Sequence, residues 1–202
     1  MLIYLITDRR SRPDLELARL VRLAAGSGAD MLQVREKDLD AAALLDCALS
    51  AVEAAGPSGP RVFVNGRPDI ALAAGAEGVQ LPADGLPAAT VRTVWGGRLR
   101  IGLSVHEAGG ADSDVSEGAD FLVCGPVFDT PSKRAYGPPI GVDALKKTVE
   151  SSNRPVFAIG GINMSTIGRL AGIPVAGVAV ISAILGAQDM AQAVLDLREK
   201  AS

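Results

Sequence analysis

Short apolar runs alternate along the chain with longer segments whose apolar residues recur at helical spacing. The short runs predict buried strands at residues 2–7, 31–34, 61–65, 78–81, 101–105, 121–127, 155–160 and 175–181. The longer segments predict helices at residues 13–26, 41–55, 68–74, 87–95, 142–151, 165–171 and 189–200. After the fifth strand, Gly109, Gly110 and an acidic stretch favour a loop or short turn over a helix.

This order amounts to eight strand-then-helix units, and such alternation is typical of parallel strands joined by crossover helices. Eight units in 202 residues predict an α/β fold, a (β/α)8 TIM barrel at the small end of its size range, formed as a single domain over residues 1–202. An open doubly wound sheet is the structural alternative. Because no Gly-x-Gly-x-x-Gly follows the first strand, a dinucleotide-binding fold is disfavoured.

Composition narrows the class of protein. Hydrophobic residues make up 48% of the chain but aromatic residues only 3%, so we expect a core of Ala, Val, Leu and Ile. The net charge of −3 and the lack of a basic stripe argue against a nucleic-acid partner. Cys47 and Cys124 lack metal-type spacing, and Cys47 sits in an apolar helical pattern. With no membrane-length apolar run and no signal-peptide pattern, we predict a cytoplasmic protein without a membrane partner.

In a barrel of this kind the active site lies where the strands end. Polar residues lie at or just after the end of nearly every predicted strand, among them Asp8, Arg35, Asn65, Gln80, Ser104 and His106. His106 is the only histidine, and histidine exchanges protons near physiological pH. A lone histidine is more often a surface or core residue, but this position at a strand end favours a proton shuttle.

The last two units carry a pattern that predicts phosphate binding. Gly160 and Gly161 end the seventh strand, and Ile181 and Ser182 open a short helix after the eighth. Barrels commonly bind phosphate with these two loops, because glycines let backbone N–H groups approach an anion at a helix start. The plain alternative for the glycine pair is a tight turn.

Cationic and hydroxyl side chains near the same end suggest a second anionic group on the ligand. Arg35 and Lys37 follow the second strand, and Thr130, Ser132 and Lys133 lie in the loop after the sixth. The plain alternatives are a structural ion pair between Arg35 and a neighbouring acid, and solvated charges in the loop.

Several motifs together resemble one family over nearly the whole chain. They are YLITD at 4–8, QVREK at 33–37, GVQL at 78–81, GLSVH at 102–106, GPVF at 125–128, TPSK at 130–133, AIGGI at 158–162 and VISAI at 180–184. The sequence is similar to the thiamine phosphate synthase and TenI superfamily. The resemblance implies a (β/α)8 barrel that acts on a thiazole phosphate in thiamine metabolism.

The sequence departs from the synthase branch at two places. The resemblance implies an aspartate after the third strand and another after the fourth, both binding Mg²⁺, whereas this chain has Gly66 and Gly85 there. The usual histidine of the fourth-strand motif is Gln80. Because Mg²⁺ prefers carboxylate oxygens, we expect no metal site, although Asp84 could substitute for one ligand.

The amino-acid sequence at residues 65–72 and 79–82 is instead similar to that of the TenI branch, the thiazole tautomerases. That resemblance implies an isomerase without a cofactor, in which His106 moves a proton from the ring of a carboxythiazole phosphate to its exocyclic carbon. Residues expected to bind this small-molecule substrate are Gln33, Arg35, Lys37, Asn65, Ser104, Thr130, Ser132 and Lys133, with its phosphate on Gly160, Gly161, Ile181 and Ser182. A homodimer is compatible with this prediction.

Two alternatives stay open at this point. One is a divergent thiamine phosphate synthase, which couples a pyrimidine diphosphate to the thiazole phosphate with Mg²⁺. The other is a protein without catalytic activity that binds thiazole phosphate as a regulator, in which His106 would be dispensable.

Overall fold

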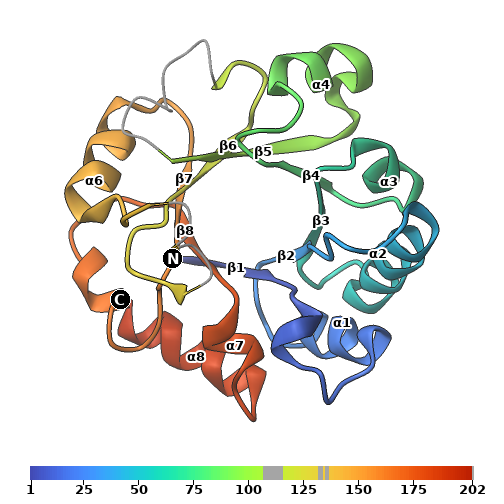
Figure 1. The fold of residues 1–202 in the computed structure, drawn as a ribbon, viewed down its shortest axis with the longest axis horizontal. Helices are drawn as coiled ribbons and strands as arrows, with labels where there is room; N and C mark the ends of the chain where they lie inside the picture. Colours follow the sequence, from blue (N-terminus) through green and yellow to red (C-terminus); the bar gives the residue numbers. More distant parts are fainter. Residues whose placement is uncertain (107–115, 132–133, 135–136, 202) are drawn as a thin grey trace.

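A closed barrel of eight parallel strands forms the centre of the computed structural model, which describes residues 1–106, 116–131, 134 and 137–201. The strands pair in chain order, and β1 also pairs with β8 to close the ring (Figure 1). Their bounds are β1 Leu2–Ile6, β2 Met31–Val34, β3 Arg61–Asn65, β4 Gly78–Leu81, β5 Arg100–Val105, β6 Phe121–Cys124, β7 Val156–Ile159 and β8 Gly177–Val180. The predicted (β/α)8 barrel is confirmed, and the open doubly wound sheet is excluded.

Helices form the outer ring (Figure 1). They are α1 Leu17–Ala25, α2 Ala41–Ala55, α3 Pro68–Ala73, α4 Ala88–Trp95, α6 Gly141–Ser151, α7 Ser182–Leu185 and α8 Met190–Lys200, with 3-10 turns η1 Arg9–Ser11, η2 Gly96–Arg98 and η4 Ile167–Leu170. The predicted helix at residues 165–171 is only the turn η4, because Gly168 weakens a helix from within and Pro174 prevents its extension. The predicted loop after β5 falls mostly on residues 107–115, outside the described residues.

The barrel has two hydrophobic layers of different composition. Between strands and helices, the buried residues are mainly Ala, Val, Leu and Ile, as the composition predicts. Inside the ring, however, the core is aromatic and consists largely of Tyr4, Phe63, Phe121 and Phe157. The rings of Phe63 and Phe121 meet edge to face with centroids 5.4 Å apart, as do those of Phe121 and Phe157. The expectation of a purely aliphatic core is therefore wrong for the barrel interior.

Glycines on neighbouring strands make room for these rings. Gly78 is the register partner of Phe63, and Gly177 is the register partner of Phe157. A Cβ on Gly78 would lie 2.8 Å from Phe63 Cε1, and one on Gly177 would lie 2.6 Å from Phe157 Cε1. Such distances are too short for carbon atoms, so each large ring requires a glycine beside it.

Both cysteines are buried and free. Cys47 lies in α2 against the core, as predicted, and burial raises its pKa to about 12. Burial also raises the pKa of Cys124. The two thiols therefore stay protonated and do not supply a reactive nucleophile. Among the described helices, none is long and apolar enough to span a membrane.

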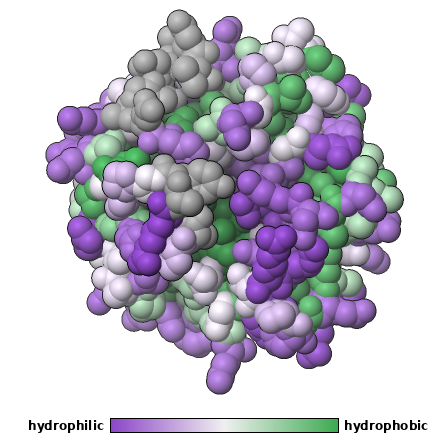
Figure 2. Space-filling view, in the orientation of Figure 1, coloured by the Kyte–Doolittle hydropathy of each residue, from purple (hydrophilic) through white to green (hydrophobic). Residues whose placement is uncertain are grey.

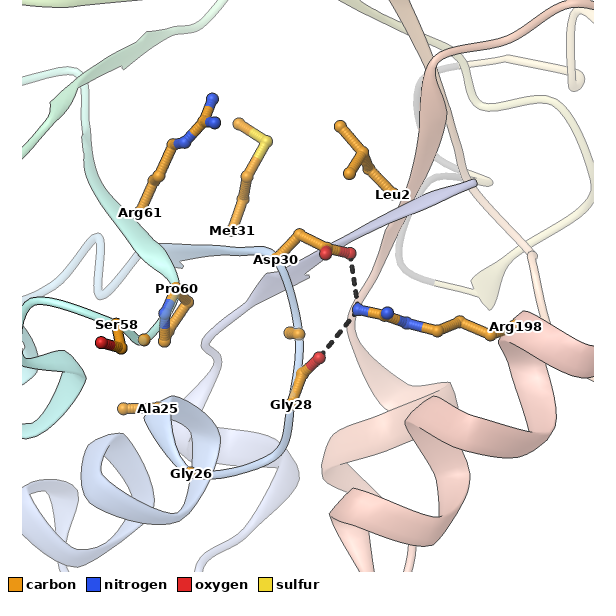
Figure 3. A pocket seen from close by; sticks show the side chains of 12 residues that line it. Leu2, Ala25, Gly26, Gly28, Asp30, Met31, Ser58, Pro60, Arg61 and Arg198 are labelled. Carbon is orange, nitrogen blue, oxygen red and sulfur yellow. Dashed lines mark hydrogen bonds and ion pairs between the residues drawn. The ribbon is translucent and has the colours of Figure 1, made fainter.

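A hollow at the amino ends of the strands contains a charged clamp rather than catalytic groups (Figure 3). Arg198 of α8 donates to the Gly28 carbonyl at 2.9 Å and to Asp30 Oδ2 at 2.8 Å. Asp30 Oδ2 also accepts the N–H of Ile3 in β1 at 2.7 Å. Asp30 thus joins the closing helix to the first strand, and this face of a barrel usually serves stability.

Adding a methyl group at Gly177 tests the packing of the barrel interior. Gly177→Ala should lower the free energy of unfolding by about 1–3 kcal/mol, because the new Cβ would meet the ring of Phe157 and the carbonyl of Leu2. Denaturant unfolding measures the effect. Gly97→Ala is the control, since nothing lies within 4 Å of its Cβ position. Equal midpoints for the two variants would contradict this packing.

Removing the Asp30 carboxylate tests the clamp. Asp30→Ala should cost about 1–3 kcal/mol of stability, because the N–H of Ile3 loses its acceptor and Arg198 loses its ion partner. The control is Asp46→Ala on the exposed side of α2. If both variants unfold at the same denaturant concentration, the clamp contributes nothing.

Candidate active site

The mouth of the barrel is the end of the ring at which the strands finish. It is formed by residues at and just after the strand ends whose side chains face the inside of the ring. In β2, Met31 packs among the inner aromatics, and Gln33 Nε2 donates to Tyr4 Oη at 3.1 Å. The β1–β2 pairing continues past the strand, because Thr7 N–H donates to the Gln33 carbonyl and Arg35 N–H donates to Thr7 Oγ1. Since side chains alternate along a strand, Arg35 faces the mouth.

Amide and hydroxyl side chains lie directly above the aromatic core on four neighbouring strands. Tyr4 is fully buried, which raises its pKa and keeps its hydroxyl neutral as the partner of Gln33. Asn65 of β3 is the register partner of Gln80 in β4, and Gln80 Nε2 donates to Ser104 Oγ in β5 at 3.1 Å. The structure therefore brings the predicted Gln33, Asn65 and Ser104 into one polar layer.

His106 continues the inward series of β5 after Gly102 and Ser104. Its Nδ1 lies 2.6 Å from the carbonyl oxygen of Gly125, just past β6. Because a carbonyl only accepts hydrogen bonds, Nδ1 carries the proton in this contact. The imidazole is thus oriented by the neighbouring strand end, and its Nε2 makes no hydrogen bond to a described residue.

Gly160 and Gly161 form the loop after β7 with backbone angles that favour glycine, φ 99° and φ 64°. A Cβ on Gly160 would lie 2.5 Å from Pro126, and one on Gly161 would lie 2.6 Å from the Asp129 carbonyl oxygen. Thr166 Oγ1 donates to the Gly161 carbonyl at 2.8 Å and holds the loop from below. The glycine pair is therefore more than a tight turn, because the loop after β6 packs directly against it.

The start of α7 lies beside this glycine loop. Ile159 of β7 is the register partner of Ala179 of β8. Gly161 and Ile181 each come two residues further along the chain, so they lie at the same height above the two strands. Ile181 is the N-cap residue of α7, and no side chain caps the first N–H groups, which begin at Ser182. The structure thus brings the predicted phosphate-binding residues together, with backbone N–H groups at hand.

Arginines neutralise three of the acids that follow β2 and β3. Arg9 Nη1 lies 3.4 Å from Glu36 Oε2 and 2.7 Å from Asp38 Oδ1, and its hydrogen bond keeps the pKa of Asp38 below the ordinary value. Arg67 binds Asp69 at 2.6 Å and lowers the pKa of that carboxyl in the same way. These acids are therefore held as ion pairs in the loops around the mouth.

Arg35 does not pair with the acid beside it. Glu36 is buried and faces the helix layer, where its charge contributes to the raised pKa of Cys47, and its ion partner is Arg9. Within the described ranges, neither Arg35 nor Lys37 forms an ion pair with a carboxylate. Arg35 is half-buried and Lys37 exposed, so both are available to an anionic ligand.

The remaining predicted residues lie in the loop after β6. Thr130 is half-buried there, whereas Ser132 and Lys133 lie outside the described residues.

Figure 1 views the barrel from the end at which the strands finish. The strands follow one another anticlockwise in this view, and with right-handed crossovers this order means that their carboxyl ends point toward the reader. On this face Figure 2 shows a mainly hydrophilic surface around a small hydrophobic area at the centre of the ring.

The residues at the mouth do not fit a magnesium ion. In the part of the chain that the structure describes, no group of three or more His, Cys, Asp or Glu residues could hold a metal. Gly66 and Gly85 occupy the two positions at which the resemblance implies aspartates, and Asp84 is a single exposed carboxylate. Mg²⁺ demands a near-octahedral shell of oxygen ligands, which these residues do not supply.

Pro82 lies between the two glycine positions. A Cβ on Gly85 would lie 2.8 Å from Pro82 Cγ, and the nearest atom to a Cβ on Gly66 would be Pro82 Cδ at 3.9 Å. The space that two side chains would share is therefore lined by a pyrrolidine ring, which offers no ligand atom.

Comparison with known proteins decides the family. The model of a family described as thiamine monophosphate synthase matches residues 3–184. A protein of Geobacter sulfurreducens named "Putative thiamine-phosphate synthase" is 46% identical, over 93% of this chain and 88% of its own length. A thiamine-phosphate synthase of Roseiflexus sp. (strain RS-1) is 37% identical, over 93% and 80%.

This chain belongs to the thiamine monophosphate synthase family. A solved structure agrees with this result. Thiamine phosphate pyrophosphorylase from Pyrococcus furiosus superimposes with a TM-score of 0.87 at 35% identity, covering 99% of this chain and 95% of its own.

The family result corrects the predicted reaction. The isomerase prediction is wrong, because relatives 37–46% identical over most of the chain are named for the synthase and not for the tautomerase. The prediction relied on Gly66 and Gly85, two positions that report on metal ligands. Identity along the whole thiamine monophosphate synthase barrel carries more information on the reaction.

Gln80 is among the polar strand-end residues that the sequence analysis names, but it was not predicted to bind the substrate. Its side chain is buried, and its Oε1 has no hydrogen-bond partner in the described structure. Gly102 leaves the space that this amide fills. Strand alternation places Gln80 in the polar layer, since Gly78 and Gln80 share the inward face of β4.

The phosphate site can be tested at Gly161. Gly161→Ala should weaken the binding of inorganic phosphate at least about tenfold, because the new methyl group displaces the loop after β6. Gly172→Ala is a matched control, since its φ is also positive, at 80°, but nothing lies within 4 Å of its Cβ position. Calorimetric titration measures both variants. Equal affinities would remove Gly161 from the site.

Proposed function

We propose that this protein is a thiamine-phosphate synthase, a transferase that joins a pyrimidine diphosphate to a thiazole phosphate. The observation that carries the proposal is the identity of 37–46% to relatives named for this reaction. The geometry of the mouth supports it, since one polar layer is flanked by a phosphate cradle and by two cations that have no carboxylate partner among residues 1–106, 116–131, 134 and 137–201. Such an arrangement suits two substrates that each bring a phosphate group.

The thiazole phosphate fits the side of the mouth formed by β7 and β8. Its phosphate would accept hydrogen bonds from backbone N–H groups at Gly160, Gly161, Ile181 and Ser182. Thr130, Ser132 and Lys133 in the loop after β6 are the further residues assigned to this substrate.

The pyrimidine fits the opposite side, above the aromatic core. A flat heteroaromatic ring needs hydrogen-bonding groups at its edge, and Gln33, Asn65 and Ser104 provide amides and a hydroxyl on neighbouring strands. The diphosphate of the same substrate would then reach Arg35 and Lys37, which follow β2.

The reaction exchanges one bond for another. The thiazole nitrogen forms a bond to the methylene carbon of the pyrimidine, while the bond from that carbon to the diphosphate oxygen breaks and the diphosphate leaves with the electron pair. The protein supplies orientation and stabilisation of the leaving charge. No proton has to move between carbon atoms, so His106 acts here as an oriented hydrogen-bonding group rather than a proton shuttle.

The direct test supplies both substrates and measures thiamine phosphate and released pyrophosphate. Wild type should form both products in equal amounts, and Arg35→Met should lower the rate by about 100-fold, because the leaving charge loses its cation. Lys146→Met, on the outer helix α6 and paired with Glu150, is the control. If wild type binds thiazole phosphate but forms no product with or without divalent cations, the transferase assignment fails and a binding protein remains.

A further inference from the structure

Two cations at the mouth, Arg35 and Lys37, form no ion pair with a carboxylate among the described residues, whereas several acids there are held by arginines. Glu36, Asp38 and Asp69 are held by Arg9 and Arg67. Asp129, after β6, is bound in the same way by Arg134 at 2.5 Å. Within the described ranges, Arg35 and Lys37 are the cations after β2 that no carboxylate neutralises.

Arg35 is held in place by its backbone and not by its side chain. Its N–H donates to Thr7 Oγ1 at 3.0 Å, and Thr7 is completely buried. The next residue, Glu36, is anchored by Arg9. Its Oε2 accepts hydrogen bonds from the backbone N–H of Arg9 at 3.2 Å and from the guanidinium of Arg9 at 3.4 Å. The guanidinium of Arg35 therefore projects from a fixed base and makes no hydrogen bond to a residue that the structure describes.

We propose that this chain binds the diphosphate of its substrate directly through Arg35 and Lys37, without a divalent cation held by its own side chains. The inference rests on the proposed function, since it names how that site neutralises the leaving group. Gly66, Pro82 and Gly85 provide no carboxylate where the resemblance implies a metal, and a cationic pair stands at the end of a nearby strand.

The chemistry of the two groups supports this exchange. An arginine guanidinium is planar and binds two phosphate oxygens at once, with charge-assisted hydrogen bonds stronger than neutral ones. A lysine ammonium adds a point charge on a flexible stem. Together they can neutralise two of the charges that a metal ion would otherwise balance.

The first experiment titrates inorganic pyrophosphate into the full chain by calorimetry, once with EDTA and once with Mg²⁺. The affinity without metal should lie within about threefold of the affinity with Mg²⁺. Arg35→Met and Lys37→Met should each weaken binding about tenfold or more in EDTA, because a charge-assisted hydrogen bond is lost. Binding that requires Mg²⁺, or no binding in either buffer, would overturn the proposal.

A matched cation separates a specific contact from general charge. Arg67 lies after the next strand and is already paired with Asp69, so Arg67→Met should change pyrophosphate affinity by about threefold at most. An equal loss in Arg35→Met and Arg67→Met would show that net charge alone attracts the anion. The phosphate cradle is separated in the same series, because binding there would be insensitive to Arg35→Met.

A second experiment rebuilds the missing ligands. Replacing Pro82 is necessary because its ring crowds a side chain at position 85. The triple variant Gly66→Asp, Pro82→Gly, Gly85→Asp should bind pyrophosphate at least about tenfold more tightly when Mg²⁺ is added. Pro82→Gly alone should show no response to Mg²⁺. If the triple variant keeps its cooperative unfolding but ignores Mg²⁺, these positions do not explain the metal independence.

The two proposals fail in different ways. Pyrophosphate binding without metal but no thiamine phosphate from both substrates would retain this inference and reject the synthase. Product formation together with strictly Mg²⁺-dependent pyrophosphate binding would retain the synthase and reject this inference.

Discussion

The packing of large aromatic rings over glycines is the constraint on which the barrel depends. Tyr4 touches three phenylalanine rings with centroids 5.7–6.1 Å apart, and the rings use space left by glycines on neighbouring strands. This core occupies the interior of the ring, which in barrels of eight strands is just wide enough for side chains to fill. The polar layer rests directly on it, because the hydroxyl of Tyr4 is the hydrogen-bond partner of Gln33.

Above that layer, acidic and basic side chains in the segments after the strands form ion pairs with one another. Glu36, Asp38, Asp69 and Asp129 are each paired with an arginine. Among the described residues, the groups that stay available to an anionic ligand include the cations Arg35 and Lys37 and the amide and hydroxyl groups of the polar layer. A site of this kind suits phosphorylated molecules, in agreement with the thiamine monophosphate synthase family to which the chain belongs.

The isomerase prediction was wrong because it relied on positions that concern metal binding. The chain has glycines at positions 66 and 85, where the resemblance implies two carboxylates, and the ring of Pro82 crowds a side chain at position 85. Such a difference describes how charge is balanced in the site, and by itself it does not describe which bond is formed. A reaction depends on the whole surface that orients its substrates, and identity along the entire barrel reflects that surface.

Periodicity and turn chemistry within short stretches are enough to predict the barrel, the strand bounds at β2, β3 and β4 and the placement of Gly160, Gly161 and Ser182. Three contacts are visible only in the folded ring: Glu36 pairs with Arg9 rather than Arg35, Gln80 reaches Ser104, and Pro82 lies between Gly66 and Gly85. These contacts join residues on different strands and loops. Their pairing is set by the register of the closed ring, which no local pattern encodes.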